Sequence, residues 1–318
     1  MNVGHVATFR PFRATDASAV NRLFRTVYGP YYVNPEIYCP HAIVRHHLAQ
    51  RWLAVLAEVG NQCIGHAALC RPSAANTHAE LALLAVHPEW CCHGIATSLA
   101  RYLMQKAHSQ SLQGVEIKQV SSHDYSQRLA TTLGFSTIAV LPDYVASPFT
   151  QGARESILLG YATFAPRPLP ALDWPDLWRP WVNKIEASFG TCSPSMMESS
   201  MLPWSVRRVM HRVDVIVDML TEDRIAELVH VPEELHYLSL PMCTAAPSAM
   251  LTLRAHGFRA AGLVPHQSGG WRAWMVRGHR AHDLTVRCPT ARALLAECLD
   301  PASSETSAPA KSRLPSTS

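Results

Sequence analysis

The sequence of 318 residues lacks long apolar runs and is poor in charge. No uninterrupted apolar stretch approaches the ~18 residues that cross a membrane, and the first residues, MNVGHVATFRPFRA, contain no apolar segment typical of an export signal. Only 16% of the residues are charged, and the net charge is +4. These values exclude a long solvated chain and a strongly basic nucleic-acid-binding protein. We therefore expect neither a membrane nor a nucleic acid as a partner.

Paired cysteines are also absent. The nine cysteines are an odd number and no CxxC occurs, so the sequence supports neither a zinc ribbon nor a thioredoxin-type motif. Hydrophobic residues make up 48% of the chain, which at this length is enough to build a core without disulfides or a metal. We expect reduced thiols, a cytoplasmic location and no bound metal.

The length favours two domains. A dense proline cluster at 165–180 interrupts both helix and strand patterns, so we predict a linker there, between a domain at 1–164 and a domain at 181–300. The last segment, 301–318, is rich in Ser and Pro and has almost nothing to bury, so we predict a disordered tail.

Hydrophobic periodicity in the first half predicts a mixed α/β fold with a mixed sheet. The predicted strands are 7–13, 52–58, 65–69, 80–87, 115–120, 135–141 and 156–161, and the predicted helices are 17–28, 40–48, 94–109 and 124–132. Strands 80–87 and 115–120 are expected to form a central parallel pair crossed by one helix. Strand 80–87 is so apolar that we predict burial of both its faces.

The second half contains a faint echo of the first. Leu133-Gly134-Phe135 is followed by Pro142, and His256-Gly257-Phe258 is followed by Pro265 at the same interval. A predicted helix, and a strand before it, precede each of the two glycines. We therefore predict two related domains.

The segment most informative about chemistry runs from Leu83 to Leu99, with the sequence LLAVHPEWCCHGIATSL. It predicts a strand ended by Pro88, a short turn and a helix. Gly94 and the small Ala96 let a ligand approach the start of this helix, where free N–H groups and the positive end of the helix dipole attract phosphate. The segment contains neither GKS/T nor GxGxxG. We predict a pyrophosphate site.

At this place the sequence resembles the GNAT acyltransferase superfamily, whose signature is Val-x-Pro-x-x-Arg/Gln-x-x-Gly-x-Gly/Ala. Val86, Pro88, Gly94 and Ala96 match it, whereas Cys91 replaces the usual Arg or Gln. Cys92 stands where a glycine is common.

Further stretches resemble a bacterial subgroup of this superfamily. They are Thr26 to Tyr32, Tyr38 to Pro40, Gly65-His66, Ala79 to Leu81, Ser122 to Gln127 and Leu133 to Phe135. The resemblance covers about 9–164. It is much weaker over 173–300, which is similar to a degenerate GNAT repeat without a phosphate loop.

The resemblance implies a GNAT-like fold that transfers an acyl group from an acyl-CoA, in most members acetyl-CoA, directly to an amine. It implies that the backbone of the strand before the loop stabilises the oxyanion. The residues expected to hold CoA are Leu84, Ala85, Val86, Cys91, Cys92, His93, Gly94, Ile95, Ala96, Thr97 and Ser98.

The catalytic residues of the superfamily are only partly retained. Ala130 stands where a Tyr often protonates the leaving thiolate, and His123 stands where an Asn is common. His123 either takes part in acid–base chemistry or CoA contact, or caps the helix. Tyr125 is an alternative phenol, although it lies more than a turn from the usual position.

Glu80 is the predicted base, because a carboxylate at the start of an apolar strand beside the cleft would have its pKa raised by desolvation. His78 projects to the same side of that strand and could share the task. A solvated residue at the strand end is the alternative interpretation of Glu80.

Tyr28, Tyr31 and Tyr32 lie in the region that walls the acceptor site in this superfamily, and we predict that they bind the acceptor; the alternative is a packed lid. The acceptor is expected to be an amine of a small molecule or a protein. Two competing hypotheses remain: a non-catalytic acyl-CoA sensor or partner-binding protein, and a decarboxylase or S-acyltransferase acting on a carrier protein. The sequence does not indicate the oligomeric state.

Overall fold

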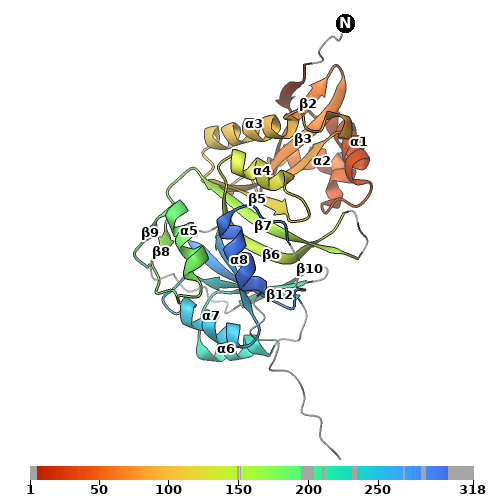
Figure 1. Cartoon of the computed structure of the whole chain (residues 1–318). Helices are drawn as coiled ribbons and strands as arrows, with labels where there is room; N and C mark the ends of the chain where they lie inside the picture. The colour runs from red at the N-terminus through yellow and green to blue at the C-terminus, as the bar shows by residue number, and fades with distance from the viewer. Residues whose placement is uncertain are drawn as a thin grey trace, which may run out of the picture.

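The computed structural model describes residues 6–148, 150, 152–194, 204–209, 212–230, 235–267, 269–280 and 284–299. Within them, twelve strands form one continuous sheet in the order β1-β2-β3-β4-β5-β7-β6-β13-β14-β12-β11-β10 (Figure 1). A two-stranded sheet joins β8 and β9. The predicted mixed α/β fold is therefore confirmed.

The elements fall into two halves along the chain. The first half contains β1 (Thr8–Pro11), α1 (Ala17–Tyr28), α2 (Pro40–Leu48), β2 (Trp52–Val59), β3 (Gln62–Cys70), β4 (His78–Val86), α3 (Ile95–Ser109), β5 (Gly114–Val120), α4 (Tyr125–Thr132), β6 (Ser136–Ala146) and β7 (Arg154–Thr163). The second contains β8 (Leu169–Pro170), α5 (Arg179–Phe189), β9 (Thr191–Cys192), β10 (Trp204–Val209), β11 (Arg212–Val217), α6 (Glu222–Val229), β12 (Leu235–Pro241), α7 (Ala246–Ala255), β13 (Arg259–Pro265), β14 (Trp271–Arg277) and α8 (Pro289–Leu299).

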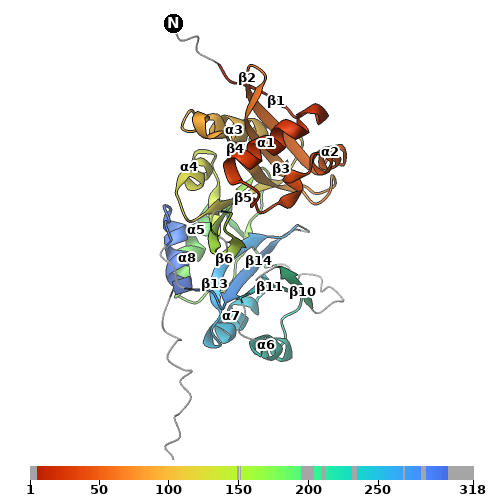
Figure 2. The ribbon, with the colours of Figure 1, turned by 90° about the vertical axis from the view of Figure 1, so that its right-hand side faces the viewer.

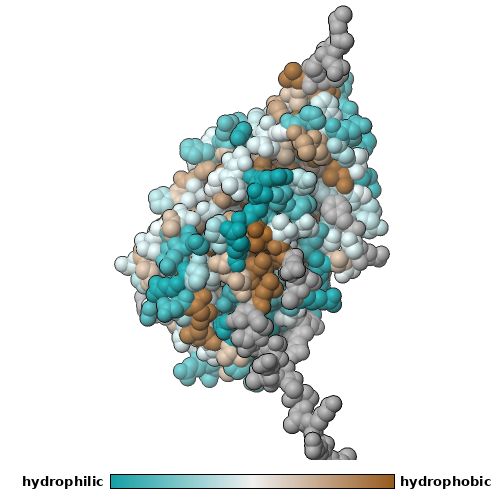
Figure 3. Space-filling model, in the orientation of Figure 1, coloured by the Kyte–Doolittle hydropathy of each residue, from teal (hydrophilic) through white to brown (hydrophobic). Residues whose placement is uncertain are grey.

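Helices cover the two faces of the sheet unequally. Helices α4, α5 and α8 lie on one side, and α1 and α2 lie on the other, over β2 to β4 (Figure 2). Hydrophobic residues gather on the surface around α8, between hydrophilic residues over α4 and α5 (Figure 3). Among the described residues, no helix covers the side opposite α8 near the middle of the sheet, where β5, β7 and β6 lie (Figure 2).

Strand β4 is buried on alternate residues only, so the prediction that both its faces are buried was wrong. Ala79 and Leu81 pack beneath α3, whereas His78 and Glu80 on the other face stay partly accessible. A bulge at Leu83, whose φ is 51°, then changes the face that the following residues present. The apolar sequence of β4 therefore reflects its packing against helices, and it does not indicate a strand buried on both faces.

The two halves repeat one strand topology. In the first half, β3 and β4 are antiparallel, β4 and β5 parallel, and β5 with β7 and β7 with β6 antiparallel. The second half has the same relations in β10-β11-β12-β14-β13. Helices α3 and α6 connect the parallel strands, and α4 and α7 precede the strands that meet at the junction of the halves.

The halves join where β6 pairs with β13, through Ala139 and Gly262. Ala139 and Gly262 are separated by the same number of residues as Gly134 and Gly257 of the repeated Gly-Phe pattern. Equivalent positions of the two halves therefore face each other. Such self-pairing indicates a local twofold relation. Gly262 has φ 139°, and a Cβ there would clash with the backbone of Ile138 and Ala139, so only glycine permits this approach.

One hydrophobic core spans the junction. It contains Ile138 and Leu158 of the first half together with Leu263 and Met275 of the second. The proline-rich segment joins it, since Leu169, Trp174 and Trp178 are buried there. The predicted boundaries at 1–164, 165–180 and 181–300 stay predictions, but the segment 165–180 packs against the core rather than running as a free tether. The predicted tail, 301–318, lies outside the described residues.

Candidate functional site

Strands β4 and β5 separate from each other after a short pairing. Four residue pairs join them, from His78–Gly114 to Leu81–Ile117. Beyond Leu81, β4 remains paired with β3 through Val86, and β5 remains paired with β7 through Val120. The β4 edge at Leu84 to Val86 therefore faces an opening, where backbone groups that no longer pair with β5 can bind an extended ligand.

The start of α3 lies at the end of β4 beside this opening. Gly94 is its N-cap, with φ 76°, and no side chain caps the helix. The first helical bond runs from Ser98 N to the Gly94 carbonyl, so the N–H groups of the preceding turn have no intrahelical acceptor. The first turn contains no acidic residue. The backbone is thus suited to an anion such as pyrophosphate.

Residues Cys91 to Gly94 are exposed, whereas Ile95 is buried and anchors the helix. Cys92 has φ 66°, in the left-handed region that glycine adopts most easily. This conformation explains why a glycine is common at that position in proteins with this signature. The presence of Cys92 instead of glycine changes only the side chain, and the backbone N–H groups of the loop stay in place.

Glu80 lies on β4 opposite Glu116 of β5, in a setting that differs from the predicted one. The Lys118 Nζ lies 2.6 Å from a Glu80 carboxylate oxygen and 3.9 Å from one of Glu116. Glu80 is therefore engaged in an ion pair, rather than isolated against apolar groups as the prediction required. Burial opposes the charge on Lys118, but the two carboxylates outweigh it and raise the pKa of the ammonium.

Burial raises the pKa of Glu116, and Lys118 opposes this shift. Neither Glu116 nor Lys118 was predicted from the sequence as a site residue. Alternation along β5 could have found them, because Val115 and Ile117 pack beneath α3 and the residues between and after them must face the other side.

His78 does not have the free imidazole that a shared base would need. Its Nε2 is hydrogen-bonded to the Arg167 guanidinium, which can only donate, so this nitrogen accepts. Burial, together with the positive charge of Arg167, lowers the pKa of His78 to about 4. His78 is therefore neutral at pH 7 and is occupied as an acceptor.

The predicted residues on and before α4 lie at the surface. His123 is exposed, and Tyr125 is 62% exposed, with the Arg128 guanidinium 4.9 Å from its ring centre. Ala130 is buried in the core beneath α3. The predicted catalytic roles of His123 and Tyr125 stay predictions.

A tyrosine from α1 reaches the opening instead. The Tyr28 hydroxyl donates to the Leu84 carbonyl at 3.0 Å, and burial raises its pKa to about 12. Tyr32 packs edge-on against Phe24 at 4.9 Å, and burial raises its pKa well above the usual value. Tyr31 is 68% exposed. The structure thus brings Tyr28 and Tyr32 to β4 and leaves Tyr31 in solvent; their predicted binding of an acceptor stays a prediction.

Two further features of the described residues bear on ligands. Within these ranges, no three side chains of His, Cys, Asp or Glu lie close enough together to hold a metal ion. No helix in the described part of the chain combines the length and apolarity needed to cross a bilayer.

The chain is similar to known acetyltransferases in its first half. The model of the acetyltransferase (GNAT) family matches residues 20–135. The sequence matches none of the curated proteins with which it was compared.

Solved structures resemble about half of the chain. The ribosomal-protein-S18-alanine N-acetyltransferase of Escherichia coli shares 16% identity, covering 50% of this chain and 95% of its own, with a TM-score of 0.42. An N-acetyltransferase of Staphylococcus aureus shares 16% identity over 50% of this chain and 98% of its own, with a TM-score of 0.43. The yncA protein of Salmonella typhimurium, solved with its cofactor acetyl-CoA, shares 16% identity over 49% and 93%, with a TM-score of 0.43.

The family match spans the opening between β4 and β5, the start of α3 and the residues of the Val-x-Pro signature. The chain therefore contains, at residues 20–135, an acetyltransferase domain of the GNAT family.

Proposed function

We propose that the chain transfers the acetyl group of acetyl-CoA to an amine. The observation that carries the proposal is the separation of β4 from β5 directly beside an uncapped helix start. An extended pantetheine chain can pair with the free edge of β4 at Leu84 to Val86, while the pyrophosphate accepts from N–H groups between Cys92 and Ala96. The thioester then lies near the point where the strands part, at Leu81 and Ile117.

The chemistry requires a neutral amine, a donor for the oxyanion and a proton for the leaving thiolate. In this proposal the free N–H groups of the β4 edge supply the oxyanion donor. The carboxylates of Glu80 and Glu116 lie on the face of the sheet opposite α3, one residue pair before the strands part, where an amine can approach the thioester.

One observation favours a second candidate, an acyl-CoA-binding protein without transferase activity. Ala130 is 2% exposed and has no hydroxyl, so α4 provides no phenol at the usual position for protonating the thiolate. Release of CoA on addition of amines distinguishes the two candidates, because only a transferase couples thiol release to an acceptor.

The binding site is tested by substituting two glycines with the same backbone conformation. Gly94 and Gly134 have φ 76° and 78°, and a Cβ at either would meet no atom within 4 Å. Gly94→Val and Gly134→Val therefore impose similar backbone strain, but only the first distorts the start of α3. We expect at least a several-fold loss of acetyl-CoA affinity by calorimetry for Gly94→Val alone.

The control decides the interpretation. Equal affinities in the two variants, with melting temperatures that show both are folded, would place the pyrophosphate elsewhere. A loss in both variants would trace the effect to general destabilisation rather than to the start of α3.

A further inference from the structure

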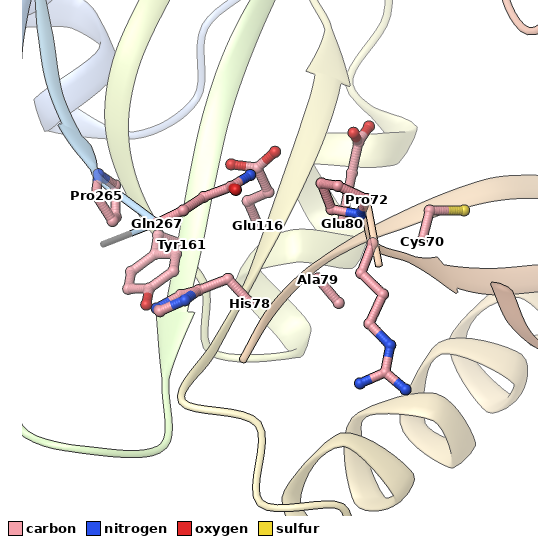
Figure 4. A pocket seen from close by; sticks show the side chains of 10 residues that line it. Cys70, Pro72, His78, Ala79, Glu80, Glu116, Tyr161, Pro265 and Gln267 are labelled. Carbon is pink, nitrogen blue, oxygen red and sulfur yellow. The ribbon is translucent and has the colours of Figure 1, made fainter. Parts of the chain in front are cut away.

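A cavity of about 320 Å³ lies between the two halves of the chain. Its walls come from β4, β5 and β7 of the first half and from the turn between β13 and β14 of the second (Figure 4). The polar side chains that line it include His78, Glu80, Glu116, Tyr161 and Gln267. Neither half alone encloses this space.

The cavity adjoins the opening between β4 and β5 from the face opposite α3. Glu80 and Glu116 are paired across the strands, and the next pair along, Leu81 with Ile117, is the last before the strands part. One residue of a strand spans about 3.3 Å. A group held by these carboxylates is therefore within a few ångströms of the point where a thioester in the opening would lie.

The two carboxylates share one ammonium group unequally. Lys118 Nζ lies within hydrogen-bond distance of Glu80, at 2.6 Å, but 3.9 Å from Glu116. The Glu116 side chain makes no hydrogen bond to any residue of the described ranges, and 34% of it is accessible. Glu116 is thus the carboxylate that can accept a second cation.

Other charged or titratable groups around Glu116 are already engaged. Arg71 donates to the Gln50 carbonyl at 3.0 Å, and Arg167 donates to the Gly270 carbonyl at 2.8 Å. The groups that face Glu116 from the packed elements are Cys70 and Arg71 of β3 and its end, His78 and Glu80 of β4, Lys118 of β5, Tyr144 of β6, Tyr161 of β7, and Arg167 before β8. Burial among them raises the pKa of Glu116, and Lys118 opposes that shift.

We propose that this cavity binds the acceptor, a small molecule with a primary ammonium group, and that Glu116 holds the ammonium and removes its proton. The role of Glu116 in the transfer reaction rests on the proposed function, whereas the binding of an amine in the cavity does not depend on it. In this proposal Glu116, rather than the predicted Glu80, is the base, and Glu80 positions Lys118.

In the proposed step, one proton moves from the acceptor to Glu116 and a second to the leaving thiolate. The Glu116 carboxylate takes one proton from the ammonium, which gives a carboxylic acid and a neutral amine. The amine nitrogen forms a bond to the thioester carbon, the carbon–sulfur bond breaks with its electron pair on sulfur, and the proton remaining in excess on nitrogen passes to the thiolate. The products are the amide and CoA thiol, and Glu116 releases its proton to water.

The second half of the chain restricts the size of the acceptor. The Asn76 side-chain amide, in the loop between β3 and β4, donates to Gln267 Oε1 at 3.1 Å and so bridges the rim of the cavity. A volume of about 320 Å³ lies at the small end of the range for ligand pockets. We therefore assign a small amine rather than the N-terminus of a protein.

Steady-state assays of CoA release test the assignment with n-butylamine, 1,4-diaminobutane, 2-phenylethylamine and an octapeptide with a free N-terminal alanine. Small amines are expected to react and the peptide to react at least 10²-fold more slowly. Glu116→Gln should lower kcat/KM by ~10²-fold or more and remove the rise of kcat/KM on the acid side of the pH profile. Glu80→Gln should keep that rise, and both variants should keep the acetyl-CoA affinity.

Variants of the rim test the contribution of the second half. Gln267→Ala should raise KM for the amine several-fold with little change in kcat, whereas Gln62→Ala, at an exposed position of β3, should change neither. Glu116→Asp retains a carboxylate and should keep the acid-side rise even if Glu116→Gln is unstable.

Each remaining outcome overturns the proposal. It fails if Glu80→Gln rather than Glu116→Gln removes the acid-side rise, if the peptide reacts as fast as the amines, or if acetyl-CoA binds and no small amine reacts. If acetyl-CoA does not bind, the proposed function fails separately. Calorimetry with n-butylamine then decides whether the cavity binds an amine, and equal affinities of the unsubstituted protein and Glu116→Gln would reject it.

Discussion

His66 is a fully buried histidine that holds β4 at the bulge. Its Nδ1 is 2.7 Å from the Leu83 carbonyl, which can only accept, so the imidazole donates there. Its other ring nitrogen has no partner among the described residues. Burial lowers the pKa of His66 to about 4, although the hydrogen bond to Leu83 opposes the shift.

This histidine makes stability dependent on pH in a defined window. The unfolded chain protonates His66 near pH 6.5 and the folded chain only near pH 4, so stability is complete above pH 6.5 and falls as the pH decreases toward 4. The loss is up to about 3 kcal/mol for such a shift. Urea unfolding of the unsubstituted protein and His66→Asn, between pH 7.5 and 4.5, should show the steeper decline in the former.

The exposed His41 provides the control, because His41→Asn should leave the slope unchanged. Parallel slopes in the unsubstituted protein and His66→Asn would show that other groups cause the decline.

At the scale of single residues, the sequence indicates the conformation of the turn before α3 more directly than it indicates the surroundings of the charged side chains. Pro88 and Gly94 are recognisable because they act through backbone conformation that neighbours in sequence determine. Glu80 was predicted to be the base because desolvation would raise its pKa. Its partner Lys118 lies on another strand, and the pairing of β4 with β5 creates the contact between them. Charges brought together by strand pairing are not visible in the local pattern.

Helices α3 and α6 hold equivalent places in the two halves but differ at their starts. The Thr221 side chain caps α6 by accepting from Arg224 N, and Glu222 and Asp223 occupy its first turn. These groups satisfy a free N–H and repel a phosphate, whereas α3 has neither feature.

Calorimetric titration with acetyl-CoA should therefore give one site per chain. The Gly94→Val variant serves as a check, because it should lose that site without revealing another. A stoichiometry of two, or a residual strong site in the variant, would show that α6 also binds the cofactor.

Among the elements, those with clear local signals agree closely with prediction. Helices α1 and α2 have the predicted limits, Ala17–Tyr28 and Pro40–Leu48. The proline-rich segment 165–180, which stays a predicted linker, packs against the core, because Trp174 and Trp178 bury large side chains there. Proline removes a backbone N–H donor and so disfavours long helices and strands, but it does not prevent the packing of neighbouring side chains.

At the scale of the whole molecule, both halves contribute residues to one hydrophobic core. Ile138, Leu158 and Tyr161 of β6 and β7 pack in one cluster with Trp271 and Leu263 of the second half. We expect the full chain to unfold in one transition, because separating the halves would expose this apolar surface. A fragment of residues 1–164 should not form a stable soluble monomer.

Two probes can follow this unfolding independently. Tryptophan fluorescence reports mostly on the second half, which contains six of the eight tryptophans, at positions 174, 178, 181, 204, 271 and 274. Acetyl-CoA binding at the proposed site should report on the first half. Coincident urea transitions are expected, and two separate midpoints, or a folded fragment 1–164, would show that the halves are independent domains.

The pairing of β6 with β13 within a single chain has a consequence for dilution. Two separate proteins that met through the same strands would dissociate as their concentration fell, and any cavity formed between them would be lost. Linked halves meet at an effective concentration in the millimolar range, whatever the amount of protein in solution. The cavity between them therefore persists at nanomolar protein, and the activity per molecule should not depend on how much of the protein a cell makes.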